Sequence, residues 1–288
     1  MGPWQAFLEA PAFCINLERR PDRRDGLLQR LGAAGFPRVS IWPAVDARSE
    51  DLETLFERHG LGRPIDVDRF MARRGSQGSL LSHLGLLAHA IERDLPLVHI
   101  FEDDVFFPPI WATQARAFHA ATPADWDLLF LGSQILYRHL PTPSVFRFLD
   151  RHPRLRSLSG RVVSRPTRIL QDIVTCPLYC THAYSLTQAG CRRLYGWLTG
   201  QPVVYGYDYM ICDGMRQSPR VSSIPLKWYA WNSLRLCPDP AGRGSDPAII
   251  QRNRGLVFQL EEEGPGVVGD KLWEAEAKGL GEDGPGLP

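Results

Sequence analysis

The 288-residue sequence lacks any apolar run of the roughly 20 residues that a membrane-spanning helix requires. Its N-terminus also lacks a basic start followed by an apolar core, so we predict neither a signal peptide nor an anchor. The 33 basic and 32 acidic residues almost balance, which gives no reason to expect nucleic acid as a partner. We therefore expect a cytoplasmic protein with, at most, peripheral association with a membrane.

Other patterns that would indicate particular sites are also missing. The six cysteines form no C-x-x-C pair, so neither a zinc ribbon nor a thioredoxin-like site is predicted. No G-x-G-x-x-G follows the first expected strand, which argues against a dinucleotide-binding oxidoreductase. A phosphatase or phosphotransferase usually places a nucleophilic aspartate after that strand, where this sequence reads INLERR.

Short apolar strands alternate with amphipathic helices, a pattern typical of an α/β fold with a mostly parallel central sheet flanked by helices. Ser79 is expected to cap the helix that carries Leu80, Leu84, Leu87 and Ile91 on one face. We predict strands within residues 11–17, 38–43, 95–101 and 125–132, helices within 18–35 and 75–94, and a strand leading into a helix over 181–198.

We predict one domain over residues 1–258. Within it, residues 138–170 are rich in arginine and proline and are expected to form a long excursion from the core. Recognition of an anionic acceptor and a plain solvated basic loop both remain open for this segment. Residues 259–288 are rich in glycine, proline and acid, and we expect a disordered tail because so little apolar surface cannot offset the entropy of ordering.

Three consecutive carboxylates, Glu102, Asp103 and Asp104, follow the apolar strand that starts at Leu95. In an extended strand, residues two apart share a face, so Glu102 and Asp104 should converge while Asp103 points away. Ligands of open α/β sheets bind beyond the carboxyl ends of the strands, and oxygen ligands select hard cations such as Mg²⁺ or Mn²⁺. The sequence therefore predicts a metal site here, with a solvated turn as the alternative.

Polar residues also surround the other expected strand ends. Asn16 could hydrogen-bond a ligand, while Arg19, Arg20 and Arg24 could hold phosphate, although a solvated helical turn would contain the same arginines.

The segment GSQGSLLSH places Ser82 and His83 close to a predicted helix N-terminus, which favours an anion. Both are candidates for an anion-binding pocket, and a structural histidine is the alternative for His83.

Five blocks carry a family resemblance. FCINLERRPDRRDGLLQRL, WPAVDAR, GSQGSLLSHLGLLAHAIERDLPLVHIFEDDV, DWDLLFLG and AYSLTQAGCRRL occur in the order typical of family 25 glycosyltransferases, and the resemblance covers roughly residues 11–250. That family includes bacterial lipooligosaccharide galactosyltransferases and animal procollagen galactosyltransferases. The resemblance implies a GT-A-like fold, a UDP-sugar donor, inversion at the anomeric carbon, and Mn²⁺, or alternatively Mg²⁺, at the acidic triplet.

The resemblance also implies roles for single residues. Asp104 would ligate the metal directly, Glu102 would be its second contact, and Asp103 would belong to the donor site. Asn16 would hydrogen-bond the uracil edge, and Asp46 would accept a hydrogen bond from a ribose hydroxyl. Ser82 and His83 would belong to the pocket for the sugar donor, and Asp246 would close the nucleotide site. One departure from the family pattern is Ser79, which stands where the family usually has cysteine.

An inverting transferase needs a general base for the acceptor hydroxyl. Asp208 aligns with the aspartate of the family's Pro-Val-Asp segment, although this chain reads Gly206-Tyr207-Asp208. A helix N-cap is the alternative reading of Asp208, and Asp213 is the second candidate for the base.

We expect transfer of galactose, with glucose as the alternative sugar, from UDP to a saccharide or glycolipid acceptor, as in lipooligosaccharide biosynthesis. Two other functions stay open: a catalytically inactive relative that serves as a binding or adhesion protein, and a procollagen-type hydroxylysine galactosyltransferase. The expected lack of a secretory signal and of a retention tail favours a role in lipooligosaccharide biosynthesis over the collagen-modifying role.

Overall fold

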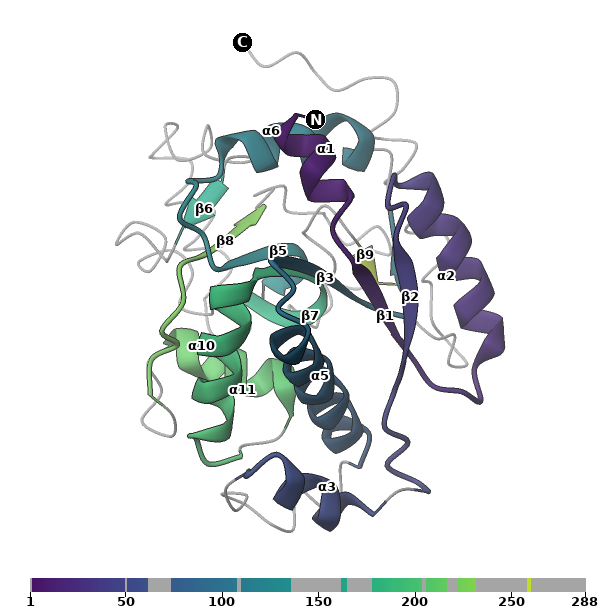
Figure 1. Ribbon diagram of the computed structural model, residues 1–288, viewed down its shortest axis with the longest axis vertical. Helices are drawn as coiled ribbons and strands as arrows, with labels where there is room; N and C mark the ends of the chain where they lie inside the picture. Colours follow the sequence, from purple (N-terminus) through teal and green to yellow (C-terminus); the bar gives the residue numbers. More distant parts are fainter. Residues whose placement is uncertain are drawn as a thin grey trace, which may run out of the picture.

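The structure is a computed structural model (Figure 1), and no helix within its described residues is both long and apolar enough to cross a membrane. The described residues are 2–49, 51–61, 74–107, 110–135, 162–164, 178–203, 206–216, 222–231 and 258–259.

A seven-stranded sheet lies at the centre of the molecule. Its strands, in spatial order, are β2 (Val39–Pro43), β1 (Ala12–Asn16), β3 (Leu97–Glu102), β7 (Leu178–Thr187), β5 (Leu128–Ile135), β8 (Trp228–Trp231) and β6 (Val162–Ser164). A separate antiparallel pair consists of β4 (Val105–Phe106) and β9 (Phe258–Gln259).

The sheet is mixed. β1 is parallel to both β2 and β3, and β5 is parallel to β8. β7 is antiparallel to both of its neighbours, β3 and β5, and β6 is antiparallel to β8. The predicted α/β class with a central sheet between helices is confirmed. Most of the strands share one direction, as predicted, but the sequence did not indicate that an antiparallel strand, β7, would lie in the middle.

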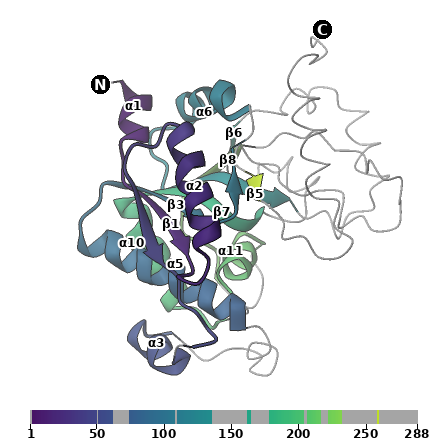
Figure 2. The same cartoon turned by 90° about the vertical axis from the view of Figure 1, so that its right-hand side faces the viewer.

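Helices cover both faces of this sheet. In both views α1 and α6 lie at the top and α3 at the bottom, and α2 lies in front in the turned view (Figures 1 and 2). The helices are α1 (Pro3–Leu8), α2 (Pro21–Ala33), α3 (Leu52–Arg58), α5 (Arg74–Glu92), α6 (Ile110–Ala121), α10 (Gln188–Thr199) and α11 (Tyr207–Arg216).

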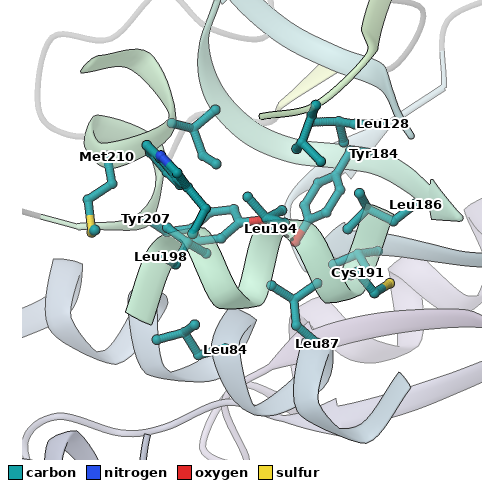
Figure 3. Packing of buried hydrophobic residues seen from close by; sticks show 14 of the residues in the cluster. Leu84, Leu87, Leu128, Tyr184, Leu186, Cys191, Leu194, Leu198, Tyr207 and Met210 are labelled. Atoms are coloured by element: carbon teal, nitrogen blue, oxygen red, sulfur yellow. Dashed lines mark hydrogen bonds between the residues drawn. The ribbon is translucent and has the colours of Figure 1, made fainter. Parts of the chain in front are cut away.

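Each face of the sheet has its own apolar core, because successive strand residues point to opposite faces. In β5, Leu128 and Phe130 join the core beneath α5, α10 and α11, whereas Leu129 and Leu131 join the core beneath α1, α2 and α6. Figure 3 shows the first of these cores. The near-continuous apolar run in β5 is therefore explained by burial on both faces.

Local sequence signals account for α2. Pro21 opens the helix, where its missing N–H costs no hydrogen bond, and Asp22 and Arg30 place opposite charges at the two ends of the helix dipole. Gly35, with φ of +96°, follows the end of the helix in a backbone conformation that glycine adopts most easily. The prediction for α5 was wrong in one respect: the helix begins at Arg74, so Ser79 lies inside it and caps nothing.

The domain limits remain predictions. Of the predicted excursion, residues 138–170, the structure describes only β6, and of the predicted tail, 259–288, it describes only Gln259. The predicted end of the domain near Phe258 falls on β9, which pairs with the strand directly after the acidic triplet.

Candidate functional site

A polar pocket of about 500 Å³ lies where β1, β2 and β3 end and α5 begins. The carboxyl ends of these parallel strands lie at one edge of the sheet, where ligands of α/β proteins bind. Basic and acidic side chains share the pocket wall, and many of them belong to residues that the sequence had singled out. The polar and charged lining residues are Arg19, Arg20, Arg23, Asp46, Arg48, Ser79, Ser82, His83, Glu102, Asp103 and Asp104.

The acidic triplet reaches this pocket, but in a different geometry from the one predicted. β3 ends at Glu102, and Asp103 and Asp104 form a turn before β4. The strict alternation of a strand therefore stops at Glu102, and the prediction that Asp103 points away was wrong. All three carboxylates line the pocket.

Asp103 is the anchored member of the triplet. Its Oδ2 accepts a hydrogen bond of 2.8 Å from Asn16 Nδ2, and its Oδ1 accepts one of 2.8 Å from Arg23. The same Arg23 guanidinium lies 3.8 Å from Asp104 Oδ2. Because Asp103 is only 8% exposed, this ion pair lies away from bulk solvent and fixes the turn against β1 and α2.

Asn16 therefore has a structural task at the site. It is buried, and its Nδ2 also donates to the carbonyl oxygen of Arg20 at 3.1 Å. Both N–H groups of the amide are thus used within the protein, and Asn16 is not among the lining residues. A contact with uracil remains a prediction for Asn16, but the observed contacts favour the positioning of Asp103.

The predicted phosphate-binding arginines differ in position. Arg19 lines the pocket and donates from Nε to Asp46 Oδ2 at 2.7 Å, a contact that holds the pKa of Asp46 below its usual value. Arg20 also lines the pocket and pairs with Asp22 at 2.9 Å.

Arg24 is the exception among the three. It pairs with Asp25 at 3.0 Å on the exposed side of α2, and it is not among the lining residues.

The first half of α5 packs tightly against the loop after β2. The Ser82 hydroxyl donates to the Gly78 carbonyl at 2.6 Å and accepts from the Val45 N–H at 2.8 Å. A Cβ on Gly78 would lie 2.6 Å from the Val45 carbonyl oxygen, so only glycine allows this approach. Ser82 thus lines the pocket mainly as the residue that holds the Asp46 loop on the helix.

His83 is buried at the back of the pocket, with 1% of its surface exposed. Its Nδ1 lies 2.8 Å from the Tyr184 hydroxyl and its Nε2 lies 3.4 Å from Glu102 Oε1. Burial lowers the pKa of His83 to about 3, and the negative charge of Asp208 opposes this shift only in part. The imidazole is therefore neutral at physiological pH.

Glu102 lies between this histidine and the pocket. Burial raises its pKa above the usual value, the negative charge of Asp103 raises it further, and Arg23 acts in the opposite direction. The side chain keeps 28% of its surface exposed, which leaves it accessible from the pocket. A carboxylate in this setting gains stabilisation when a cation binds beside it.

The predicted base, Asp208, directly follows Tyr207, whose ring stacks on His83, and it is not among the residues that line the pocket. Asp208 is the second residue of α11, and its Oδ1 accepts from the Tyr209 N–H at 2.9 Å. The negative charge of Asp208 acts to raise the pKa of His83, against the larger effect of burial. Asp213 lies further along α11, half-buried, and Asp246 falls outside the residues that the structure describes.

The donor set fits a hard divalent cation that is shared with a ligand. Within the described residues, no three His, Cys, Asp or Glu side chains form a metal-binding group. Glu102 and Asp104 nevertheless offer carboxylate oxygens to one pocket. Mg²⁺ and similar ions usually take one or two carboxylates and complete their shell with water and substrate phosphates, so two ligands suffice for such a site.

Sequence reasoning missed several residues of this site. Arg23 and Arg48 line the pocket, although only their neighbours had been singled out. Arg23 lies in the first turn of α2 and Arg48 in the turn after β2, so the nearness of both to a strand end was a signal that could have found them. Tyr184 and Tyr207, which contact His83, lie more than 100 residues away from it in the sequence and gave no local signal.

The fold and the pocket together define a class: an α/β protein whose polar pocket, at the ends of parallel strands, suits an anionic ligand together with a hard cation. Comparison with known protein families identifies the family within this class to which the chain belongs. The family described as "Glycosyltransferase family 25 (LPS biosynthesis protein)" matches residues 9–211, and the chain belongs to that family.

Individual relatives agree with this assignment. A "Glycosyltransferase 25 family member" of Drosophila melanogaster is 31% identical over 129 residues, which are 43% of this chain and 21% of the relative. "Procollagen galactosyltransferase 2" of Mus musculus is 30% identical over 139 residues, 46% of this chain and 22% of the relative. The matched part thus spans about a fifth of the length of these relatives.

Two further matches differ in kind. The "Inactive glycosyltransferase 25 family member 3" of Homo sapiens is 28% identical over 203 residues, which are 66% of this chain and 29% of the relative. Among solved structures, the apo form of mouse xyloside xylosyltransferase 1 matches 69% of this chain and 66% of its own at 10% identity. Its TM-score of 0.26 is too low to establish a shared fold.

Proposed function

We propose that the chain is a metal-dependent, inverting glycosyltransferase of GT-A type that moves galactose from UDP-galactose to a saccharide or other hydroxylated acceptor. The observation that carries this proposal is the pocket at the ends of β1 and β3, where three carboxylates face arginines within about 500 Å³. A nucleotide sugar contains a diphosphate, which needs both a cation and positive side chains. A relative named for galactose transfer to procollagen supports the choice of sugar.

The protein's own residues supply most of the chemistry. Asp208 would accept the proton of the acceptor hydroxyl as the new bond to the anomeric carbon forms and the bond to the diphosphate breaks. Arg19 and Arg48, which line the same pocket, would stabilise the phosphate oxygens. Glu102 and Asp104 would hold Mn²⁺ or Mg²⁺, which neutralises the charge of the departing UDP.

A second candidate function is binding without catalysis. It is favoured by the length of the match to a relative named inactive, which covers 66% of this chain, against 46% for the galactosyltransferase relative. The residues of the acidic triplet argue against it, because they are present and accessible in the pocket.

One experiment separates these functions. The purified protein is incubated with Mn²⁺ and either UDP-galactose or UDP-glucose, and the slow release of UDP by hydrolysis is measured with and without a chelator. We expect release that needs the metal and is faster with UDP-galactose. Metal-dependent binding of UDP without any release would instead support the inactive alternative, and no binding at all would refute both.

A further inference from the structure

Three buried polar side chains form a series of hydrogen bonds that runs from helix α11 to Glu102, the first residue of the acidic triplet. The Tyr207 hydroxyl donates to the Tyr184 hydroxyl at 3.0 Å, and Tyr184 lies 2.8 Å from Nδ1 of His83. Nε2 of His83 then lies 3.4 Å from Glu102 Oε1. Tyr207, Tyr184 and His83 are each 1% exposed, so these contacts exclude water. Figure 3 shows the two hydroxyl groups pointing toward each other within an apolar core.

The number of protons available determines the direction in which these hydrogen bonds are donated. A neutral imidazole has one N–H and one acceptor nitrogen, and each tyrosine has one proton to donate. If the donors run from Tyr207 through Tyr184 to His83 Nδ1, then His83 donates from Nε2 to the Glu102 carboxylate. Every proton finds an acceptor in this order. When a cation is bound at Glu102, the last acceptor is a charged carboxylate, which gives a stronger hydrogen bond.

The opposite direction is less favourable. Glu102 would have to be protonated and to donate to His83, and the last donor, the buried Tyr207 hydroxyl, would then lose its acceptor. A buried donor without an acceptor costs about 1–3 kcal/mol.

Packing fixes the histidine ring in the plane that this direction requires. The ring of His83 stacks on Tyr207 with centroids 4.1 Å apart and an interplanar angle of 4°. Its ring also stacks on Tyr184 at 5.7 Å. With its plane held by Tyr207 and Nδ1 held by Tyr184, the imidazole can present Nε2 in one direction only, toward Glu102.

We infer that Tyr207, Tyr184 and His83 form a hydrogen-bonded relay that orients the Glu102 carboxylate for cation binding. The three are positioning residues, because none of them needs to touch the cation or the sugar. This inference rests on the proposed function, in which Glu102 is a metal ligand. It also explains why the residue before Asp208 is a tyrosine in this chain: the helix that carries the candidate base is attached to the metal site through the same relay.

The close approach of α11 supports this attachment. A Cβ on Gly206 would lie 3.0 Å from the Ser76 Cβ and 3.1 Å from the Ser76 carbonyl oxygen, so the start of α11 lies directly against α5. That contact and the stacking of the Tyr207 ring on His83 hold α11 against α5 at two points. A shift of α11 would therefore move His83, and with it the donor to Glu102.

The test uses two substitutions of His83, one that retains the contact with Glu102 and one that retains the contact with Tyr184. His83→Gln can place an amide N–H near the position of Nε2, and so retains a donor to Glu102. His83→Asn can place an oxygen near the position of Nδ1, and so retains an acceptor for Tyr184 but loses the donor. Mn²⁺ affinity is measured in the presence of UDP by electron paramagnetic resonance, which requires no turnover.

We expect His83→Asn to weaken Mn²⁺ binding about 10- to 100-fold, the usual effect of losing the partner of a metal ligand. His83→Gln and Tyr184→Phe should show smaller losses. Tyr195→Phe is the matched control, since it removes a similar contact of 3.2 Å between a tyrosine hydroxyl and His59 Nδ1 elsewhere in the molecule, and it should leave Mn²⁺ affinity unchanged.

The outcomes separate the relay from the proposed function. If the wild-type protein binds Mn²⁺ but His83→Asn binds it as tightly as His83→Gln does, the relay is refuted and the metal site stands. If the wild-type protein binds no Mn²⁺ with UDP, the proposed function fails, and the orienting role fails with it. Nitrogen-15 spectra of the histidine rings test the direction without metal: we expect the Nε2–H tautomer for His83, and the Nδ1–H tautomer would overturn the relay.

Discussion

The ion pair between Arg23 and Asp103 should contribute measurably to stability, because it is both partly buried and shared with Asn16. The side chains of Arg23 and Asp103 are 22% and 11% exposed, and their closest atoms are 2.8 Å apart. Asp103→Ala removes two hydrogen bonds to a charged acceptor, each of which is worth about 1.5–3 kcal/mol when its partner stays behind. Arg23 keeps Asp104 at 3.8 Å, so we expect a net cost of about 2–4 kcal/mol.

The assay is urea denaturation of the single variants Asp103→Ala and Arg23→Gln and of the double variant, and the coupling energy is taken from this cycle. We expect a coupling of about 1–3 kcal/mol, which is the size for charged hydrogen bonds with limited access to water. The matched control is the exposed pair Arg20 and Asp22, at 2.9 Å, for which the coupling should lie within experimental error. Equal coupling in the two pairs would refute the reasoning that burial makes the Arg23 pair stronger.

Three further predictions concern the base, the pocket wall and the core. Asp208→Asn should leave UDP binding near normal and lower kcat by about 10² to 10⁴, as measured by single-substrate kinetics; unchanged turnover would move the base to Asp213. Gly78→Ala should weaken UDP affinity and lower Tm, because its Cβ would push the Val45 carbonyl away from α5; calorimetry should show neither change if that contact is unimportant. Burial lowers the pKa of His99 to about 4, so between about pH 6.5 and 4 only the unfolded chain takes up a proton at this residue. The free energy of unfolding should therefore fall by about 3 kcal/mol as the pH is lowered through this range. A His99 ring signal that titrates near pH 6 in NMR spectra of the folded protein would contradict this.

Much of the fold could be predicted because its signals are local. The apolar runs, the proline at the start of α2 and the glycine after its end lie within a few residues of the features that they determine. The antiparallel strand β7 could not be predicted this way. Its direction depends on pairing with β3 and β5, strands that lie at least 40 residues away in the sequence, and nothing within Leu178–Thr187 encodes which neighbours it will have.

The candidate site shows the same division. The acidic triplet, Arg19 and Asp46 were predicted, since all of them directly follow strands that end at one edge of the sheet. Asp103 was misjudged because the chain turns immediately after Glu102, where strand geometry no longer applies.

The partners of His83 were missed for a different reason. Tyr184 and Tyr207 are aromatic residues in apolar segments, and the sequence gives them the pattern of ordinary core residues. Only the packing of β7 and α11 against α5 brings their hydroxyl groups to the histidine.

Binding of a divalent cation together with a nucleotide diphosphate at the acidic triplet is tested most directly by a calorimetric titration of UDP into wild-type protein and Asp104→Asn, each with and without Mn²⁺. We predict that wild-type protein binds UDP much more tightly with Mn²⁺ and that Asp104→Asn loses this dependence while it keeps its Tm, since the substitution removes charge from a pocket and not volume from the core. Asp125→Asn, which removes the same charge from an exposed pair with Lys227, should bind like wild type. If Asp104→Asn instead binds UDP with undiminished, metal-dependent affinity, the assignment of Asp104 as a metal ligand is contradicted.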